Sequence, residues 1–181
     1  MKLSILVCTL KARHVMFAKL AADIQSQIKD KKEVELLYFS DRGGLSVGWK
    51  RQELLKQASG DYICYVDDDD KVSDFYVRDI LEAIKPRPDC VGLEGVLCRK
   101  GQKDATFIHS LQCTRWRETK GVFYRTPNHL NPVKKGIALQ AGFKDLRYGE
   151  DRLYSEVIYP LLKKEVMVTS PLYYYYPGAS Q

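Results

Sequence analysis

The first half of the chain alternates short apolar segments with longer amphipathic ones, and this alternation constrains the fold more than any other feature. The short segments are rich in β-branched and aromatic residues, as buried strands are, and they are residues 3–8, 34–39 and 62–66. The longer segments repeat apolar side chains at spacings of three and four, as helices do, and they are residues 13–29, 46–58 and 73–85. We therefore predict a Rossmann-like α/β domain with a mostly parallel central sheet flanked by helices.

The second half is less regular and predicts a smaller, antiparallel part of the same single domain, residues 1–181. Expected strands cover residues 91–99, 106–111, 121–125, 166–169 and 172–176. Expected helices cover residues 133–141, with Gly142 at the C-terminal cap, and 152–162. We predict two functional halves, residues 1–89 and residues 90–181.

Four consecutive carboxylates, Asp67 to Asp70, follow the predicted strand 62–66. Two unit charges about 4 Å apart repel by roughly 4 kcal/mol near a protein surface, so a divalent cation would relieve the cluster. Mg²⁺ and Mn²⁺ prefer oxygen ligands and commonly link a carboxylate to substrate phosphates. The alternative is a solvated acidic turn that caps the helix beginning near Ser73.

Composition limits the classes of protein that are compatible with the chain. Its 181 residues are 45% hydrophobic and 29% charged, which is ordinary for one globular domain. The apolar run at the N-terminus is too short to span a membrane and lacks a signal-peptide cleavage pattern. Five cysteines without CxxC spacing favour reduced thiols and a cytoplasmic location. The net charge of +6 favours an acidic partner such as a nucleotide, a nucleic acid or an anionic membrane.

Polar residues follow each of the three predicted parallel strands. Residues 9–13 come after the first, Asp41 after the second, and Asp67 to Asp70 after the third. Ligands of such sheets bind at the carboxyl ends of the strands. We therefore expect these side chains to converge on one pocket.

The ordered set of these motifs resembles the family-two glycosyltransferases of the GT-A fold. The resemblance extends from about Leu3 to Ser155, and it rests on the strand ending in Cys8-Thr9-Leu10, Asp41, residues 48–63, Asp67 to Asp70, and Gly149-Glu150-Asp151. Two departures are Gln52, where many relatives carry Asn, and the small size of the chain.

The resemblance implies a UDP-sugar donor and a divalent metal, Mn²⁺ or Mg²⁺. It assigns Asp67 and Asp69 to the metal, Asp41 to the uracil and Asp151 to the catalytic base, for which a plain helix cap is the alternative. It also implies that residues 1–89 bind the nucleotide sugar, whereas residues 90–181 bind the acceptor and supply the base. Further donor contacts are expected from Thr9, Lys11, Arg13, Lys50, Arg51 and Asp68, although the basic side chains could equally form solvated surfaces.

His129 lies in a turn-rich segment and is a candidate third metal ligand or acceptor contact, the alternative being a loop histidine bonded to the backbone. The other residues assigned to the acceptor are Glu150, Trp116, Arg125 and Asn131, the last alternatively a turn former. His14 and His109 are taken as structural residues.

The acceptor prediction rests on residues 98–135, where aromatic residues are interleaved with nine basic ones: Arg99, Lys100, Lys103, Arg115, Arg117, Lys120, Arg125, Lys134 and Lys135. Basic side chains that neutralise phosphates and aromatic faces that stack on bases are typical of nucleic-acid binding. The segment is also similar to small glycosyltransferases of bacteriophages, which would act in the host cytoplasm. We expect an inverting transferase with a 5-hydroxymethylpyrimidine of DNA as acceptor. The alternatives are a cell-surface or lipid-linked glycan as acceptor, and a non-catalytic module that binds nucleotide sugar or DNA.

Overall fold

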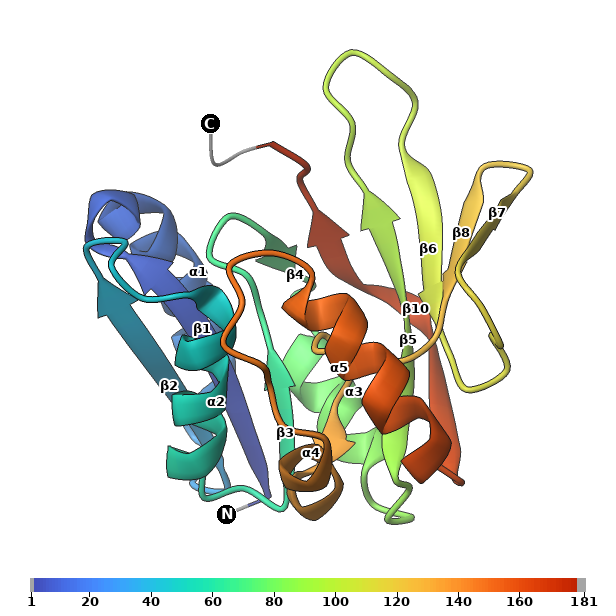
Figure 1. Ribbon diagram of the computed structural model, residues 1–181, viewed down its shortest axis with the longest axis horizontal. Coiled ribbons are helices and arrows are strands. Elements are labelled where there is room, and N and C mark those ends of the chain that lie inside the picture. Colours follow the sequence, from blue (N-terminus) through green and yellow to red (C-terminus); the bar gives the residue numbers. More distant parts are fainter. Residues whose placement is uncertain (1, 179–181) are drawn as a thin grey trace.

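The protein is a three-layer α/β domain, described for residues 2–178 by a computed structural model (Figure 1). Residue 1 and residues 179–181 of the predicted domain lie outside the described residues. The three parallel strands of the first half are β1 (Leu3–Leu10), β2 (Val34–Asp41) and β3 (Tyr62–Tyr65). β1 lies between β2 and β3, as a crossover connection on each side requires.

Helices cover both faces of the sheet (Figure 1). One face packs on α1 (His14–Ile28) and α3 (Tyr76–Ala83), where Ile24 and Ile80 join Ile5 of β1 in one core. The other face packs on α2 (Val47–Gln57), α4 (Lys135–Ala141) and α5 (Glu150–Ile158). There Leu54, Ala138 and Ile158 meet Leu6 and Tyr65 in a second core. Alternate residues of the strands thus supply the two cores, as the period of two along a strand requires.

The second half extends the same sheet. β5 (Cys90–Leu97) pairs antiparallel with β6 (Ala105–His109) and parallel with β10 (Glu165–Tyr175). β8 (Val122–Arg125) runs parallel to β6 and carries β7 (Arg117–Thr119) at the edge. Short strands β9 (Val133–Lys134) and β4 (Lys71–Val72) pair with β3 and β10, respectively.

Most predicted elements are confirmed, with four differences. The pair β6 and β8 is parallel, whereas we expected antiparallel strands, because the chain crosses over between residues 109 and 122 before it pairs. The two expected closing strands form one strand, β10, with irregular register around Pro171. The helix expected at residues 133–141 begins at Lys135, because Val133 and Lys134 pair with β3. The helix expected from Ser73 begins at Tyr76.

Local signals at the ends of two helices are confirmed. Ser46 caps α2, because its hydroxyl accepts a hydrogen bond from the Trp49 amide at 3.0 Å. Gly142 follows α4 with a φ of 59°, in the region that glycine adopts most easily. All five cysteines are free thiols. Among residues 2–178, none of the helices has both the length and the apolar character needed to cross a bilayer.

Candidate active site

The carboxylate cluster stands directly after β3, and its four members have different surroundings. Asp68 is 3% exposed and accepts hydrogen bonds from the Thr9 hydroxyl at 2.6 Å and from the Arg13 guanidinium at 2.6 Å. Thr9 lies at the carboxyl end of β1, the neighbouring strand, and Arg13 follows that strand. Asp68 therefore ties the ends of two parallel strands together and has little capacity left for a ligand.

Asp67 lies at the centre of a buried charge network. The Arg51 guanidinium, 4% exposed, donates to Asp67 at 2.8 Å and to Glu150 at 2.8 Å. The nearest ring nitrogen of His129 is 3.3 Å from Asp67. Burial alone would raise the pKa of Asp67, but the charges of Arg51 and His129 hold it well below its usual range. Burial raises the pKa of Glu150, which Arg51 partly offsets.

Asp69 is the member of the cluster with the weakest protein partner, since the Arg13 guanidinium lies 3.5 Å from it. Burial and the neighbouring charge of Asp67 raise its pKa. Asp67 and Asp69 are therefore two partly exposed carboxylates whose mutual repulsion a cation would relieve.

Asp70 turns away from the other three carboxylates and is held by β10. The Tyr173 hydroxyl donates to Asp70 at 2.7 Å, and the Tyr176 amide donates to it at 2.8 Å. The same hydroxyl accepts a hydrogen bond from the Asp67 amide at 3.0 Å. Burial and the charge of Asp67 raise the pKa of Asp70 to about 8. The C-terminal strand thus fixes the turn that carries the cluster.

Asp41, at the end of β2, forms an ion pair with Lys50 at 2.9 Å and accepts the amides of Gly43 and Leu45. Burial would raise its pKa, but these amides and the Lys50 ammonium lower it to about 2. Lys50 is itself 4% exposed and also donates to the Thr9 carbonyl. Both side chains therefore shape the loop after β2.

These side chains border an open cleft at the carboxyl ends of β1 and β3, which we call the acidic cleft. Its far wall is the segment before α5, where Arg147 donates to the carbonyls of Gly43 and Gly44 at 3.0 Å each. Tyr148 stands on that wall with 90% of its surface exposed. The acidic cleft is lined by Cys8, Thr9, Leu10, Arg13, Gly43, Leu45, Val47, Lys50, Arg51, Asp67, Asp68, Asp69, His129, Arg147, Tyr148, Gly149, Glu150 and Asp151.

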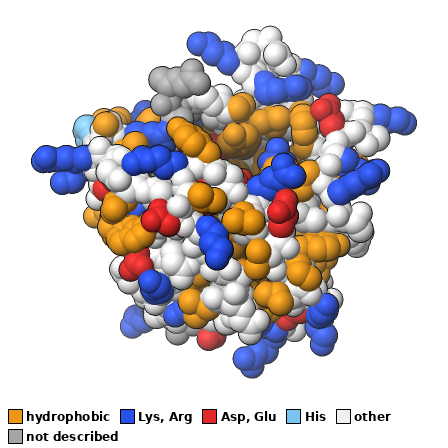
Figure 2. Space-filling model, in the orientation of Figure 1, with side chains coloured by type: hydrophobic (Ala, Val, Ile, Leu, Met, Phe, Trp, Pro, Cys, Tyr) orange, Lys and Arg blue, Asp and Glu red, His pale blue; other side chains and the backbone are white. Residues whose placement is uncertain are grey.

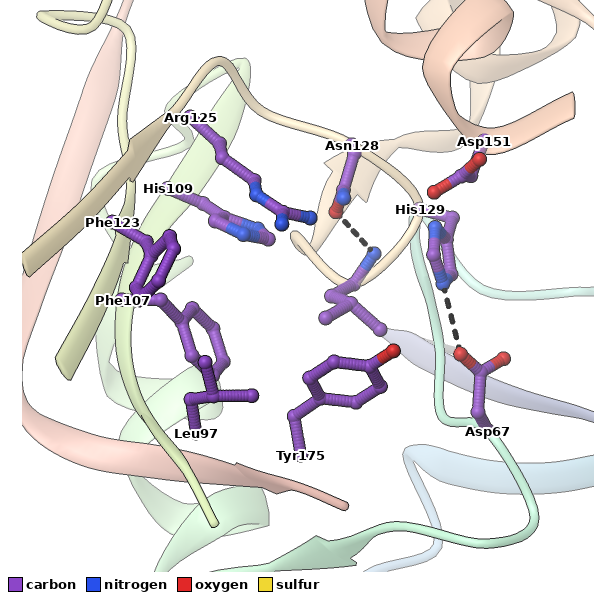
Figure 3. A pocket seen from close by; sticks show the side chains of 11 residues that line it. Asp67, Leu97, Phe107, His109, Phe123, Arg125, Asn128, His129, Asp151 and Tyr175 are labelled. Atoms are coloured by element: carbon purple, nitrogen blue, oxygen red, sulfur yellow. Dashed lines mark hydrogen bonds and ion pairs between the residues drawn. The ribbon is translucent and has the colours of Figure 1, made fainter. Parts of the chain in front are cut away.

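A second cavity adjoins the acidic cleft, and we call it the aromatic chamber (Figure 3). Its volume of about 130 Å³ is below the usual range for small-molecule sites, about 300–1,000 Å³. It is lined by Leu97, Phe107, His109, Phe123, Arg125, Asn128, Leu130 and Tyr175, together with Asp67, His129 and Asp151. On the face shown in Figure 2, the molecule is hollowed near its upper middle, with hydrophobic side chains at the border of the hollow.

Asp67, His129 and Asp151 line both cavities and mark the boundary between them. Asp151 lies in the first turn of α5. The helix begins directly after Gly149, whose φ of 78° turns the chain into it. A helix N-terminus favours a charged carboxylate. The arrangement presents a carboxylate to whatever occupies the junction of cleft and chamber.

The structure brings together most of the residues predicted for the site. Four of them line neither cavity. Lys11 is exposed on the turn after β1, and Asp41 lies behind the loop that it holds. Trp116 stacks outside the chamber on Arg125, at 4.4 Å. Asn131 is fully buried: its side-chain oxygen accepts the Asn128 amide at 2.9 Å within the turn, and its side-chain amide donates to the backbone carbonyls of Val91 and His109.

Sequence reasoning did not assign several lining residues to the site, among them Phe107, His109, Tyr175, Arg147 and Tyr148. The first two alternate on one strand, a pattern of aromatic residues that signals a common face. Nothing in the local sequence of Arg147 or Tyr148 distinguishes them from an ordinary surface loop.

The layered sheet and the carboxylates at the end of β3 define a domain of the GT-A fold. A family model described as "Glycosyl transferase family 2" matches residues 19–144, more than half of the chain. The chain therefore belongs to glycosyl transferase family 2. The match ends before Asp151.

Solved structures support the fold. S. aureus TarS 1-349 in complex with UDP-GlcNAc is similar to 97% of this chain with a TM-score of 0.69 and 15% sequence identity. TarS 1-349 in complex with UDP gives a TM-score of 0.69 at 16% identity, also over 97% of this chain. This chain spans 58% and 60% of those two structures, respectively. Longer TarS gives a TM-score of 0.63 at 18% identity, with 96% of this chain and 36% of TarS covered. No curated protein matches the sequence.

Proposed function

We propose that this protein is a metal-dependent, inverting glycosyltransferase that transfers a sugar from a UDP-sugar to a hydroxyl group of a hydroxymethylated pyrimidine in DNA. The observation that carries this proposal is the junction of two cavities at Asp67, His129 and Asp151. A transferase of this class needs a donor site and an acceptor site that share one boundary, with a base at that boundary.

The acidic cleft suits the donor. Among residues 2–178, no three side chains of the types His, Cys, Asp and Glu meet closely enough to hold an ion by themselves. Mg²⁺ is commonly held by one or two carboxylates together with substrate phosphates, so Asp67 and Asp69 fit a metal that arrives with the diphosphate. When bound, the metal would neutralise charge on the departing diphosphate. The UDP and UDP-GlcNAc complexes of TarS support a UDP-sugar as the donor class.

The chain's own residues account for the remaining steps. The acceptor oxygen attacks the anomeric carbon, its proton passes to the Asp151 carboxylate, and the bond from the anomeric carbon to the diphosphate oxygen breaks. UDP then leaves with the electron pair of that bond. Arg13 and Arg51 border the cleft, where their ion pairs with carboxylates reduce the negative charge that an incoming diphosphate meets. A single displacement of this kind inverts the anomeric configuration.

The surface around the aromatic chamber supports DNA as the acceptor. The loop between β5 and β6 and the segment from residue 114 to residue 121 expose cationic side chains: Lys100, Lys103, Arg115, Arg117 and Lys120. Such a surface attracts phosphates without regard to sequence. It would also suit an anionic membrane that carries a lipid-linked glycan, which is the alternative acceptor.

The test is mass spectrometry of nucleosides from 5-hydroxymethylcytosine and 5-hydroxymethyluracil DNA after incubation with protein, Mn²⁺ and a panel of UDP-sugars. We expect a mass gain equal to one sugar residue, lost on addition of EDTA and lowered at least about 100-fold by Asp151→Asn, since general bases contribute about 10²–10⁴-fold. Metal-dependent hydrolysis of a UDP-sugar without any mass gain in the nucleosides would support a glycosyltransferase whose acceptor is a glycan and not DNA.

A non-catalytic binding module is the remaining alternative. If neither transfer nor hydrolysis occurs with any UDP-sugar, while UDP still binds, the chain is such a module. If Asp69→Asn and Asp151→Asn leave turnover unchanged, the proposed roles of both carboxylates are wrong.

A further inference from the structure

One wall of the aromatic chamber is built from alternate residues of neighbouring strands. The parallel register of β6 and β8 sets Phe107 beside Phe123 and His109 beside Arg125. Figure 3 shows these four side chains on one side of the chamber, with Asp67, His129 and Asp151 on the opposite side. Because each pair is two residues from the next on its strand, all four side chains share a face.

Gly95 leaves room for one ring of this wall. It lies on β5 and pairs with Phe107 of β6, and a Cβ built at position 95 would lie 2.1 Å from the tip of the Phe107 ring. A larger residue would therefore push the ring into the chamber. Tyr175 of β10, paired with Leu97, closes the adjoining side and is 40% exposed.

The polar groups that share the wall with Phe107 and Phe123 are His109 and Arg125, whereas the carboxylates of Asp67 and Asp151 lie on the opposite side of the chamber. His109 is 2% exposed, and its Nδ1 has no hydrogen-bond partner among the described residues. Burial and the nearby Arg125 charge lower the pKa of His109 to about 3, so its imidazole is neutral near pH 7. Arg125 forms no ion pair with any carboxylate within residues 2–178 and rests on the Trp116 ring. The wall away from Asp151 thus offers ring faces, a neutral imidazole and one cation.

This chemistry discriminates between two kinds of acceptor. A pyranose presents hydroxyl groups around its whole edge, and each would need a partner to avoid the cost of an unsatisfied buried polar group, about 1–3 kcal/mol. On this wall only Arg125 and His109 can supply such partners, because the rings of Phe107 and Phe123 supply none. A pyrimidine presents two apolar faces for stacking, and carbonyl and ring nitrogen atoms at its edge for Arg125 and His109.

We infer that the aromatic chamber binds a single pyrimidine ring, unstacked from its neighbours in the strand, with its hydroxymethyl group directed to Asp151. The inference rests on the proposed function and narrows it, because a base that is still paired in a duplex cannot enter a cavity of this kind. The protein therefore acts on single-stranded DNA or on a base flipped out of the duplex. The exposed cations on either side of the chamber then hold the flanking phosphates.

The first experiment measures binding to the full chain saturated with UDP and Mg²⁺, by ligand-observed NMR titration. The two probes are 5-hydroxymethyl-2′-deoxyuridine and methyl β-glucopyranoside. We expect the nucleoside to bind and the glucoside to bind at least about tenfold more weakly. Tighter binding of the glucoside would overturn the inference.

Substitutions in the aromatic chamber test whether the nucleoside binds there. Phe123→Leu removes an aromatic face from the wall, and we expect it to weaken nucleoside binding about 5- to 100-fold, the range found when a base loses its stacking partner. Phe75→Leu, at a phenylalanine that is 54% exposed before α3, is the matched control. His109→Phe keeps a ring and removes the unpaired nitrogen, and should also weaken the nucleoside. UDP affinity within about twofold of wild type will show that each variant is folded. Unchanged nucleoside affinity in both chamber variants would contradict the inference.

The second experiment compares transfer rates on one hydroxymethylated oligonucleotide in three forms. We expect the rate to fall from single strand to mismatched duplex to matched duplex, because unpairing a matched base costs most. Equal or faster transfer to the matched duplex would refute a flipped-out base. Failure of the proposed function gives a different result, namely neither transfer nor hydrolysis of a UDP-sugar by the wild-type protein, whatever the nucleoside titration shows.

Discussion

Tyr173→Phe is the sharpest test of how the carboxylate cluster is held. The substitution removes one oxygen from a side chain that is fully buried. That oxygen donates to Asp70 at 2.7 Å and accepts from the Asp67 amide at 3.0 Å. A buried polar group left without its partner costs about 1–3 kcal/mol, and the Asp67 amide at the cleft can regain a water. We therefore expect a loss of about 2 kcal/mol in the free energy of unfolding.

Urea denaturation followed by circular dichroism will measure this loss. In a thermal melt of a domain of this size, 1 kcal/mol corresponds to a shift in Tm of about 2–4 °C. The loss expected for Tyr173→Phe should therefore lower its Tm by about 4–8 °C. Tyr38→Phe is the matched control, because Tyr38 is 57% exposed and its hydroxyl makes no hydrogen bond with another described residue. It should unfold as wild type does.

The same substitution should affect activity, since the turn that carries Asp67 and Asp69 would lose a support. A positional cost of about 1.4 kcal/mol in the transition state would lower kcat/KM for the UDP-sugar about tenfold. If Tyr173→Phe matches Tyr38→Phe in both stability and kcat/KM, the hydroxyl has no supporting role and our account of β10 is wrong.

Two further predictions concern packing and pH. Gly48→Ala should destabilise the protein by at least about 3 kcal/mol, because a Cβ there would lie 1.9 Å from the Lys144 carbonyl oxygen, a backbone atom that cannot rotate away. Gly136→Ala, in open space within α4, should instead stabilise it by about 0.5–1 kcal/mol in the same urea titration; a similar loss in both variants would rule out a steric cause. Burial would raise the pKa of Asp89, but Lys134 and two backbone amides lower it. The ionised Asp89 therefore contributes to the free energy of unfolding above the unfolded pKa of about 3.9, and this contribution is lost as pH falls through the lower folded pKa. Asp89→Asn should therefore be less stable than wild type at pH 7, with a difference that shrinks below about pH 4; a difference independent of pH would assign the effect to packing, and Asp30→Asn, at an exposed surface position, is the control.

The acidic cleft was largely predictable from the sequence for a physical reason. In consecutive strand–helix units the side chains that follow each strand must meet at one edge of the sheet. Thr9 and Arg13 therefore could be expected beside Asp68 before the structure was known, and they contact it at 2.6 Å each. The Ser46 cap and the Gly142 terminus are likewise local signals.

The aromatic chamber was not predictable in the same way, because its walls depend on pairing between distant strands. Leu97, Phe107, Phe123 and Tyr175 come from four strands, and the parallel pairing of β6 with β8 decides which side chains face the cavity. Composition indicated residues 98–135, which supply part of the chamber, yet it selected Trp116, which stacks outside the chamber on Arg125. The tyrosine run of β10 has no alternation from which its single continuous strand could be inferred.

Arg51 shows why the two sides of the site keep a fixed spacing. One buried guanidinium joins Asp67, at the end of β3, to Glu150, the first residue of α5. The next residue along the helix is Asp151, so the proposed metal ligand and the proposed base are linked through a single planar group. An arginine is suited to this link because its fork of donors is rigid, whereas a lysine would offer one point charge. The rings of Tyr65 and Phe143 lie 5.7 Å and 5.9 Å from the guanidinium carbon and limit its movement further. Since displacement at a sugar requires base and leaving group on opposite sides of one carbon, this rigid link supplies the alignment that the proposed reaction needs before either substrate binds.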